Sequence, residues 1–275
     1  MKPLALALFA AATAPALAVN IGSGYSQNFN SLGSSGTTLT AGGTPDWSTW
    51  RIRLDSTWNG PTWTDSTGIP AADLVNGILV DDTLNVSPNN QPLGLFYNAS
   101  FPTFTRRGGI NAGHSTDPND IDRALGTSGT GVAGMALQVS LTNDTAAAMP
   151  TLAISYDTTV LSIAAQQGGP DELLGYRFFY SLTGPTGTWI SAAALDTVTS
   201  ISDAAFTNYT TAATISLASS LAPGQSILLR WVDDNAQQSS PDQMIAIDNV
   251  SVVPAPGAAA LLGLGGLLIS RRRRA

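Results

Sequence analysis

The sequence predicts an all-β protein, an antiparallel β-sandwich of the jelly-roll type. Short segments in which apolar and polar residues alternate recur along the chain, and clusters of Gly, Pro, Asn and Asp separate them. No helical period lies between these segments, which favours a sandwich over an α/β fold. Glu172 is the only glutamate and Lys2 the only lysine. Surface helices rely on both residue types, so the composition also disfavours helices.

The second half of the chain contains the clearest strand patterns. In residues 135–143, the apolar side chains at 137, 139 and 141 point to one face and the polar ones at 138, 140 and 142 to the other. Similar patterns predict strands over residues 151–156, 176–182, 212–217, 226–234 and 244–253. Residues 19–120 have weaker patterning, and we expect strands joined by long surface loops there. No repeat and no linker divides the chain, so residues 19–252 are expected to form one extracellular domain.

Residues 1–18 have the features of a secretory signal peptide, predicted as an N-terminal signal helix. These features are Lys2, an apolar stretch over residues 4–12, and small residues at Ala16 and Ala18. Cleavage after Ala18 leaves Val19 as the mature N-terminus. The sequence therefore predicts an exported protein, with the Sec translocon and signal peptidase as partners.

The other end of the chain, residues 253–275, combines two prolines, an apolar run and four arginines. The apolar run over residues 257–269 spans only about 20 Å as a helix, at about 1.5 Å per residue. It is therefore a marginal transmembrane segment. The cluster Arg271, Arg272, Arg273 and Arg274 is expected on the cytoplasmic side, with the preceding domain outside.

This tail resembles a PEP-CTERM sorting signal of the VPAPG type. The motif residues are Val253, Pro254, Ala255, Pro256 and Gly257, followed by the apolar helix and the arginine cluster. The resemblance implies export in a Gram-negative bacterium that makes extracellular polysaccharide. It also implies a transient inner-membrane anchor, processing by an exosortase, and delivery to the cell envelope, outer surface or extracellular matrix.

The domain itself is similar to uncharacterised extracellular domains that precede such signals. The segments that carry this likeness are NFNSL (28–32), DRALG (122–126), LAISYD (152–157), RFFYS (177–181) and the stretch from residue 229 to 252. The last of these is also similar to the final strands of lectin-like jelly rolls, which implies a structural role for the aspartate of the last strand.

Charge and cysteine content exclude several classes of function. The chain has 19 acidic and 12 basic residues, a formal net charge of −7. Such a surface repels phosphate, so nucleic acid is not an expected partner. An acidic surface attracts divalent cations or keeps an exported protein soluble. With no cysteine, disulfides, thiol catalysis and cysteine-ligated zinc are all excluded.

The sequence does not predict an enzyme. His114, the only histidine, lies in a Gly/Asp/Asn-rich segment that could expose a general base. The G-x-S-x-G motif of serine hydrolases is absent, and metal hydrolases usually need two or three imidazoles. Carboxylate pairs occur at Asp81–Asp82 and Asp233–Asp234, but adjacent residues on a strand face opposite sides. No catalytic residue is therefore assigned.

Two sets of residues are candidate binding sites. The tryptophans Trp47, Trp50, Trp58 and Trp63 could stack on sugar rings, or could belong to the core. The oxygen-bearing residues Asp233, Asp234, Asn235 and Asp242 could bind calcium with help from backbone carbonyls and water, or could be solvated turn residues. The expected cofactors are therefore none or calcium.

Asp248 is expected to be half-buried, because strict alternation places it on the same strand face as Val250 and Val252. A buried carboxylate needs a partner, and we predict a structural ion pair with Arg230 or with Arg123.

The sequence predicts a structural or adhesive role in a surface layer or polysaccharide matrix. The alternative is a calcium-stabilised carbohydrate-binding module, and the third hypothesis is a glycan-active hydrolase. Extracellular polysaccharide is accordingly an expected partner.

Overall fold

The computed structural model describes residues 18–34, 39, 43–53, 87–89, 94–96, 109–115, 117, 119–128, 133–162, 174–185, 187–233 and 243–255. The expected signal peptide up to residue 17 and the tail from residue 256, with its arginine cluster, lie outside the described residues. Within the described part of the chain, no helix is long and apolar enough to cross a membrane.

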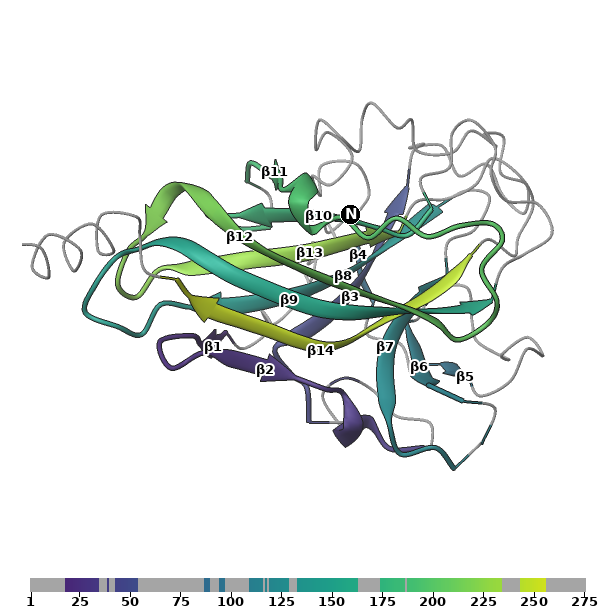
Figure 1. Ribbon diagram of the computed structural model, residues 1–275. Coiled ribbons are helices and arrows are strands. Elements are labelled where there is room, and N and C mark those ends of the chain that lie inside the picture. The colour runs from purple at the N-terminus through teal and green to yellow at the C-terminus, as the bar shows by residue number, and fades with distance from the viewer. Residues whose placement is uncertain are drawn as a thin grey trace, which may run out of the picture.

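The described residues form strands and two short 3-10 helices (Figure 1). The strands of the first half are β1 (Val19–Asn20), β2 (Tyr25–Gln27), β3 (Trp47–Arg53), β4 (Ser87–Asn89), β5 (Gly94–Phe96), β6 (Ile110–Gly113) and β7 (Arg123–Ser128). Those of the second half are β8 (Ala133–Thr142), β9 (Met149–Ser162), β10 (Tyr176–Ser181), β11 (Ile190–Ser191), β12 (Thr207–Leu221), β13 (Ser226–Asp233) and β14 (Met244–Pro254). The 3-10 helices are η1 (Asn30–Leu32) and η4 (Ala193–Leu195).

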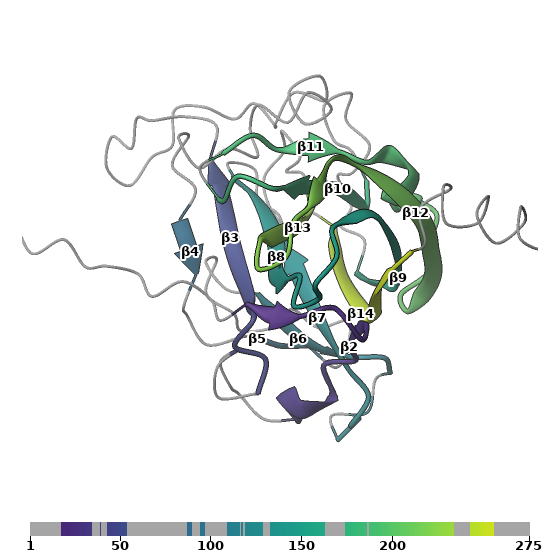
Figure 2. The same cartoon turned by 90° about the vertical axis from the view of Figure 1, so that its left-hand side faces the viewer.

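The strands form two sheets that pack face to face, which confirms the predicted β-sandwich (Figure 2). Sheet A has the order β11-β10-β13-β8-β3-β4, with β1 beside β8. Sheet B has the order β12-β9-β14-β7-β6-β5, with β2 beside β14. Most pairs are antiparallel, whereas β1–β8 and β5–β6 are parallel. From β7 to β10, successive strands alternate between the two sheets.

The strands predicted in the second half of the chain are all present. The predicted strand over residues 151–156 is the middle of the longer β9, and the one over 212–217 is part of the longer β12. The expected domain boundary at residue 252 falls inside β14, which continues through Val253 and Pro254. The backbone N–H of Ala255 then donates to the carbonyl of Thr151 (3.2 Å), so these residues of the expected sorting motif are attached to sheet B.

Trp231 of β13 is at the centre of the apolar core between the sheets and is fully buried. Its ring stacks on Trp47 of β3, with centroids 5.4 Å apart. The rings of Tyr156 in β9 and Phe178 in β10 meet it edge-on at 5.5 and 5.2 Å. Edge-on and offset pairs are favourable aromatic geometries, so this cluster joins both sheets.

The last strand contains a β-bulge at Asn249 that determines which side chains face the core. Asp248 pairs with Asp157 and Ser251 with Ser155, so β14 has two residues where β9 has one. Asn249 has φ 50°, a left-handed conformation that Asn adopts more readily than most residues. Ile245, Ile247, Val250 and Val252 belong to the central core, whereas Met244 and Ala246 belong to a second cluster on the outer face of sheet B.

Candidate functional site

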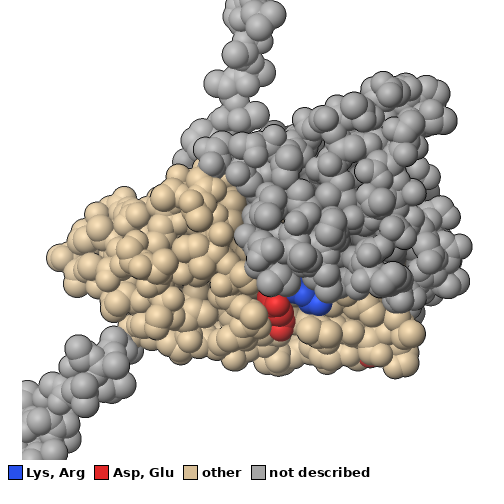
Figure 3. All heavy atoms as spheres, turned by 90° about the horizontal axis from the view of Figure 1, so that it is seen from above, with Lys and Arg blue, Asp and Glu red and all other residues tan. Residues whose placement is uncertain are grey.

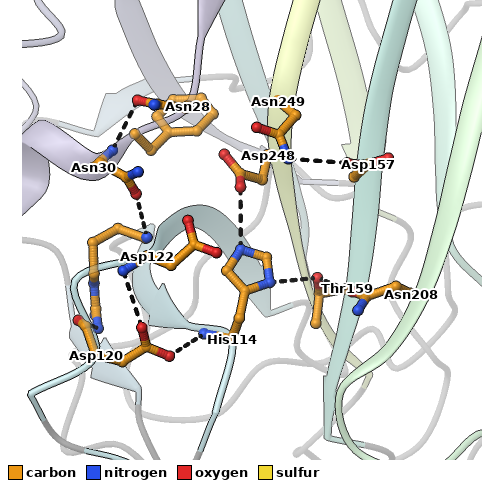
Figure 4. Close-up of polar contacts among 12 residues, drawn as sticks. Asn28, Asn30, His114, Asp120, Asp122, Asp157, Thr159, Asn208, Asp248 and Asn249 are labelled. Atoms are coloured by element: carbon orange, nitrogen blue, oxygen red, sulfur yellow. Dashed lines mark hydrogen bonds and ion pairs between the residues drawn. The ribbon is translucent and has the colours of Figure 1, made fainter.

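Three side chains that can bind a metal ion meet on the outer face of sheet B. They are His114, just after β6, Asp122, just before β7, and Asp248 of β14. One ligand atom from each lies within 4.8 Å of the others. Figure 4 shows the imidazole and the two carboxyl groups turned toward one another. We call these three residues the outer-face cluster.

Asp120 organises the loop that carries two members of the outer-face cluster. Its Oδ2 accepts hydrogen bonds from the backbone N–H of His114 (3.1 Å) and from the hydroxyl of Ser115 (2.8 Å). Its Oδ1 accepts one from the backbone N–H of Asp122 (3.0 Å). Burial alone raises the pKa of the Asp120 carboxyl, but these hydrogen bonds outweigh burial and hold that pKa below its ordinary value. The carboxylate thus fixes the positions of residues 114 and 122.

Arg123 anchors the end of this loop to β6 and is fully buried. Its guanidinium donates to the side-chain oxygen of Asn111 (2.8 Å), to the Asn111 carbonyl (2.6 Å) and to the Asp120 carbonyl (3.2 Å). Its backbone N–H donates to Oδ1 of Asn30 (2.7 Å). The buried hydrogen bonds from Arg123 to Asn111 therefore hold the end of this loop against β6.

His114 contacts a different group with each ring nitrogen. Nε2 lies 3.2 Å from Oδ2 of Asp248, and Nδ1 lies 3.2 Å from the hydroxyl of Thr159 in β9. The hydrogen bond with Asp248 is the main cause of a raised pKa at His114, with burial acting in the opposite direction. The imidazole is 19% exposed and the Asp248 side chain 2% exposed. The outer-face cluster thus has a buried side at Asp248 and an open side at Asp122, which is exposed.

The second carboxyl oxygen of Asp248, Oδ1, is buried and has no hydrogen-bond partner among the described residues. An unpaired buried polar atom is costly, by about 1–3 kcal/mol in typical measurements, and more where the group is charged. Such an atom beside an imidazole and a further carboxylate is unusual in a folded protein.

The predicted ion pair of Asp248 with Arg230 is wrong, because the two residues lie on opposite outer faces of the sandwich. Arg230 alternates along β13 with Leu229 and Trp231, which point into the core, so its own side chain points outward from sheet A. There its Nε and Nη2 donate to Oε1 of Gln138 (2.9 and 2.6 Å), and its guanidinium lies over Trp189. Asp248 faces outward from sheet B and pairs with His114.

The alternative partner, Arg123, is also wrong. Its neighbour Ala124 packs with Ala246 on the outer face of sheet B, so Arg123 points to the other face, toward Asn111. Asp248 does not share a face with Val250 and Val252 either, because the bulge at Asn249 interrupts the alternation.

The predicted tryptophan platform is not formed at Trp47. This residue is 2% exposed, and its Nε1 donates to the hydroxyl of Tyr25 (2.6 Å) inside the core. Trp50 is half-buried on the outer face of sheet A, with the Arg230 guanidinium 5.2 Å from its ring centroid. Trp58 and Trp63 lie outside the described residues. A single surface built from all four tryptophans is therefore excluded by Trp47.

Of the residues predicted to bind calcium, only Asp233 is described, and it is buried at the end of β13. Asp234, Asn235 and Asp242 lie outside the described residues, as do Asp81 and Asp82. Calcium at this position stays a prediction.

A second feature of sheet B is the outer face of β9, β12 and β14, where small hydroxyl-bearing side chains face solvent. Cross-strand pairs such as Thr210–Asp157, Ser216–Thr151 and Ser251–Ser155 place these residues side by side. The face is exposed along β12 and half-buried along β9 and β14. We call it the hydroxyl face, and its members are Thr151, Ser155, Thr210, Thr214, Ser216 and Ser251.

Comparison with known proteins gives no family. No family model and no curated protein matches the chain. Among solved structures, it is similar to a xylan-binding module, CBM15, with 15% identity over 58% of this chain and 90% of that one, at a TM-score of 0.31. It is also similar to TmCBM61 in complex with β-1,4-galactotriose, with 10% identity over 49% of this chain and 72% of that one, at a TM-score of 0.29.

A third similar structure is the Stig cyclase FisC from Fischerella sp. TAU, with 16% identity over 85% of this chain and all of that one, at a TM-score of 0.38. At such scores, the likeness carries no information about function. The functional argument therefore depends on the described residues alone.

Proposed function

We propose that this chain is an exported β-sandwich protein that adheres to extracellular polysaccharide through the hydroxyl face of sheet B. The observation that supports this proposal most directly is the chemistry of that face. Its six named members are short, uncharged and able both to donate and to accept hydrogen bonds, as sugar hydroxyls are, and Asp157 beside Thr210 adds one carboxylate acceptor. An extended sugar chain could therefore lie along β9 and β12 and exchange hydrogen bonds with successive residues.

Neighbouring residues of the hydroxyl face keep it open and regular. Strands β9 and β12 pair without interruption from Thr207–Val160 to Ser216–Thr151, so outward side chains repeat at every second position. Ala153 and Ala212 lie between the hydroxyl-bearing residues and add no bulk. Figure 3 views the molecule from above, where the described surface is mostly uncharged apart from one group of acidic and basic side chains. On the hydroxyl face itself, the six named members carry no charge, which suits a neutral or weakly acidic polymer.

The export and sorting parts of this proposal depend on the two ends of the sequence. The signal peptide, the Pro-containing motif and the arginine cluster support delivery to the envelope and processing by an exosortase. The jelly-roll connection is likewise our proposal, supported by the alternation of successive strands between the two sheets.

We propose a binding role rather than catalysis, because the described residues around His114 do not form a nucleophile–base pair. The hydroxyl nearest to the imidazole belongs to Thr159, and it donates its proton to Oδ1 of Asn208 (2.5 Å). A nucleophilic hydroxyl would instead donate its proton to the imidazole.

Polysaccharide binding can be tested on the full chain with alginate, a uronic acid polymer, and with dextran, a neutral one. Thr214→Glu adds bulk and negative charge at the centre of the hydroxyl face, and we expect at least a tenfold loss of affinity. Thr188→Glu makes the same chemical change at an exposed position between β10 and β11, away from the hydroxyl face, and should bind like the wild type. Equal binding by both variants, or no binding to either polymer at high protein concentration, would contradict the proposal.

A further inference from the structure

We propose that the outer-face cluster is a binding site for a divalent transition-metal ion of the zinc type, with Nε2 of His114 and the carboxylates of Asp122 and Asp248 as ligands. The inference is independent of polysaccharide binding, because it depends only on the three side chains and their neighbours. It arises from the hydrogen bonds around Nδ1, the ring nitrogen turned away from Asp248, and from the unpaired oxygen of Asp248.

The hydrogen bonds on the far side of the ring determine the tautomer of His114. The Thr159 hydroxyl has one proton, which it donates to Asn208. Toward His114, the Thr159 oxygen is therefore an acceptor, and Nδ1 must carry the proton of that hydrogen bond. In the neutral imidazole, Nε2 then has a free lone pair directed at a carboxylate oxygen of Asp248, 3.2 Å away. Two lone pairs do not approach this closely unless a cation lies between or beside them.

A metal ion explains more of the site than a proton does. A proton on Nε2 satisfies only Oδ2 of Asp248 and leaves the buried Oδ1 without a partner among the described residues. Because Nδ1 is already protonated, a proton on Nε2 makes an imidazolium with a single positive charge, whereas two carboxylates, Asp122 and Asp248, lie within the same 4.8 Å. A divalent ion bound between the three ligand atoms neutralises both carboxylates and accepts the lone pair of Nε2.

The ligand set indicates the kind of metal. Calcium prefers six to eight oxygen ligands, whereas zinc is usually four-coordinate and readily accepts imidazole together with carboxylates. Ligand atoms about 2.0–2.1 Å from a tetrahedral zinc ion are about 3.3 Å from one another. The separation of 3.2 Å between Nε2 of His114 and Oδ2 of Asp248 agrees with this geometry. The three ligand atoms lie within 4.8 Å of one another, so the exposed Asp122 side chain would move toward the ion on binding. The exposure of Asp122 leaves the fourth position to water or to a ligand in solution.

The residues behind the ligands would hold them in place before the metal binds. Thr159 orients the imidazole and, with Asn208, fixes its tautomer, as carbonyl or carboxylate partners do for many metal-bound histidines. Asp120 fixes the backbone of both residues 114 and 122. Thr159 and Asp120 are thus positioning residues, which are close to the metal without binding it.

Because His114 is the only histidine, its imidazole can be observed directly in the full chain produced without a histidine tag. Two-bond ¹H–¹⁵N correlation spectra distinguish the two tautomers and a metal-bound nitrogen. We expect one equivalent of Zn²⁺ to shift the Nε2 resonance strongly while Nδ1 keeps its proton. Co²⁺ should give the visible absorption of a four- or five-coordinate nitrogen–oxygen site. Failure of one equivalent of Zn²⁺ to change the imidazole signals would overturn the proposal.

Variants separate the ligands from their surroundings by calorimetry with Zn²⁺ and with Ca²⁺. Asp122→Asn, at an exposed position, should weaken Zn²⁺ binding at least tenfold, and Thr159→Val should do so about tenfold. Asp117→Asn is the matched control, since Asp117 is an exposed carboxylate of the same loop outside the outer-face cluster, and it should bind Zn²⁺ like the wild type. Equal loss in Asp117→Asn, or displacement of Zn²⁺ by equimolar Ca²⁺, would show that the site is not of the zinc type.

Discussion

Removing the hydroxyl of Tyr25 should destabilise the domain far more than one lost surface hydrogen bond would. Tyr25 belongs to β2 of sheet B, and its hydroxyl donates to Oδ2 of Asp46 (2.5 Å) next to β3 of sheet A. The same hydroxyl accepts a hydrogen bond from Nε1 of Trp47 (2.6 Å). All three residues are less than 10% exposed: 8% for Tyr25, 4% for Asp46 and 2% for Trp47. This buried group therefore connects the two sheets.

The Tyr25→Phe variant leaves one buried acceptor and one buried donor without their partner. Leaving a buried polar group unpaired costs about 1–3 kcal/mol, with the larger values for charged groups such as the Asp46 carboxylate. Both groups stay buried in otherwise unchanged surroundings, so we expect Tyr25→Phe to lose about 3 kcal/mol of unfolding free energy. For a domain of this size, that loss lowers the thermal midpoint by about 6–12 °C. Chemical unfolding in urea at pH 7 measures the free energy directly.

Tyr209→Phe is the matched control, because the hydroxyl of Tyr209 also donates to a carboxylate, Oδ2 of Asp203 (2.7 Å). Tyr209 is half-buried at the surface, and water can replace the lost hydrogen bond there. We expect a loss below about 1 kcal/mol for this variant. If Tyr25→Phe costs no more than Tyr209→Phe, the hydroxyl of Tyr25 does not link the sheets as we infer.

Three further predictions concern buried groups. Burial raises the pKa of the Asp46 carboxyl above its ordinary 3.8. The stability that this group contributes is therefore present below pH 3.8 and is lost as the pH rises through the folded-state pKa. Asp46→Asn should accordingly be more stable than the wild type at pH 7, and urea titrations should show this gain shrinking as the pH falls to 4. Gln138→Leu removes the acceptor of two Arg230 donors and should cost about 3 kcal/mol, whereas Gln138→Glu should cost less, as thermal melts can show. Trp231→Ala should cost about 3–5 kcal/mol and abolish the near-UV circular dichroism of the core aromatic cluster.

The strand pattern of the sandwich was predictable, because alternation of apolar and polar residues is a local property. Residues 226–233 show this well: Ile227, Leu229 and Trp231 are core residues at every second position, as period-two alternation requires. The extra length of β12 was not predictable in the same way. Its exposed face is made of residues such as Thr210 and Thr214, which occur in turns as well as in strands, and only pairing with β9 makes them a strand.

The outer-face cluster could not be predicted, because its members come from distant parts of the chain. His114 attracted notice as the only histidine, but Asp122 and Asp248 are joined to it only by the pairing of β6, β7 and β14. The sequence signal that could have indicated the site is the density of Asp around the single histidine, at Asp117, Asp120 and Asp122. That signal does not distinguish loop capping by Asp120 from metal binding by Asp122.

The bulge at Asn249 explains why Asp248 can serve the site without weakening the core. Strict alternation continuing from Ile245 and Ile247 would place Asn249 in the core and would turn Val250 outward. The extra residue restores Val250 to the core, and Asp248 remains outward beside His114. Asn249 suits this position because asparagine tolerates a positive φ, and its side-chain amide donates to Oδ2 of Asp157 (3.0 Å) on the neighbouring strand. A β-branched residue would be strained at φ 50°, and a shift of one residue in β14 would exchange the faces of its side chains. The bulge therefore lets the outward Asp248 and the inward Val250 stand two residues apart, which is why alternation counted back from Val250 and Val252 assigned Asp248 to the wrong face.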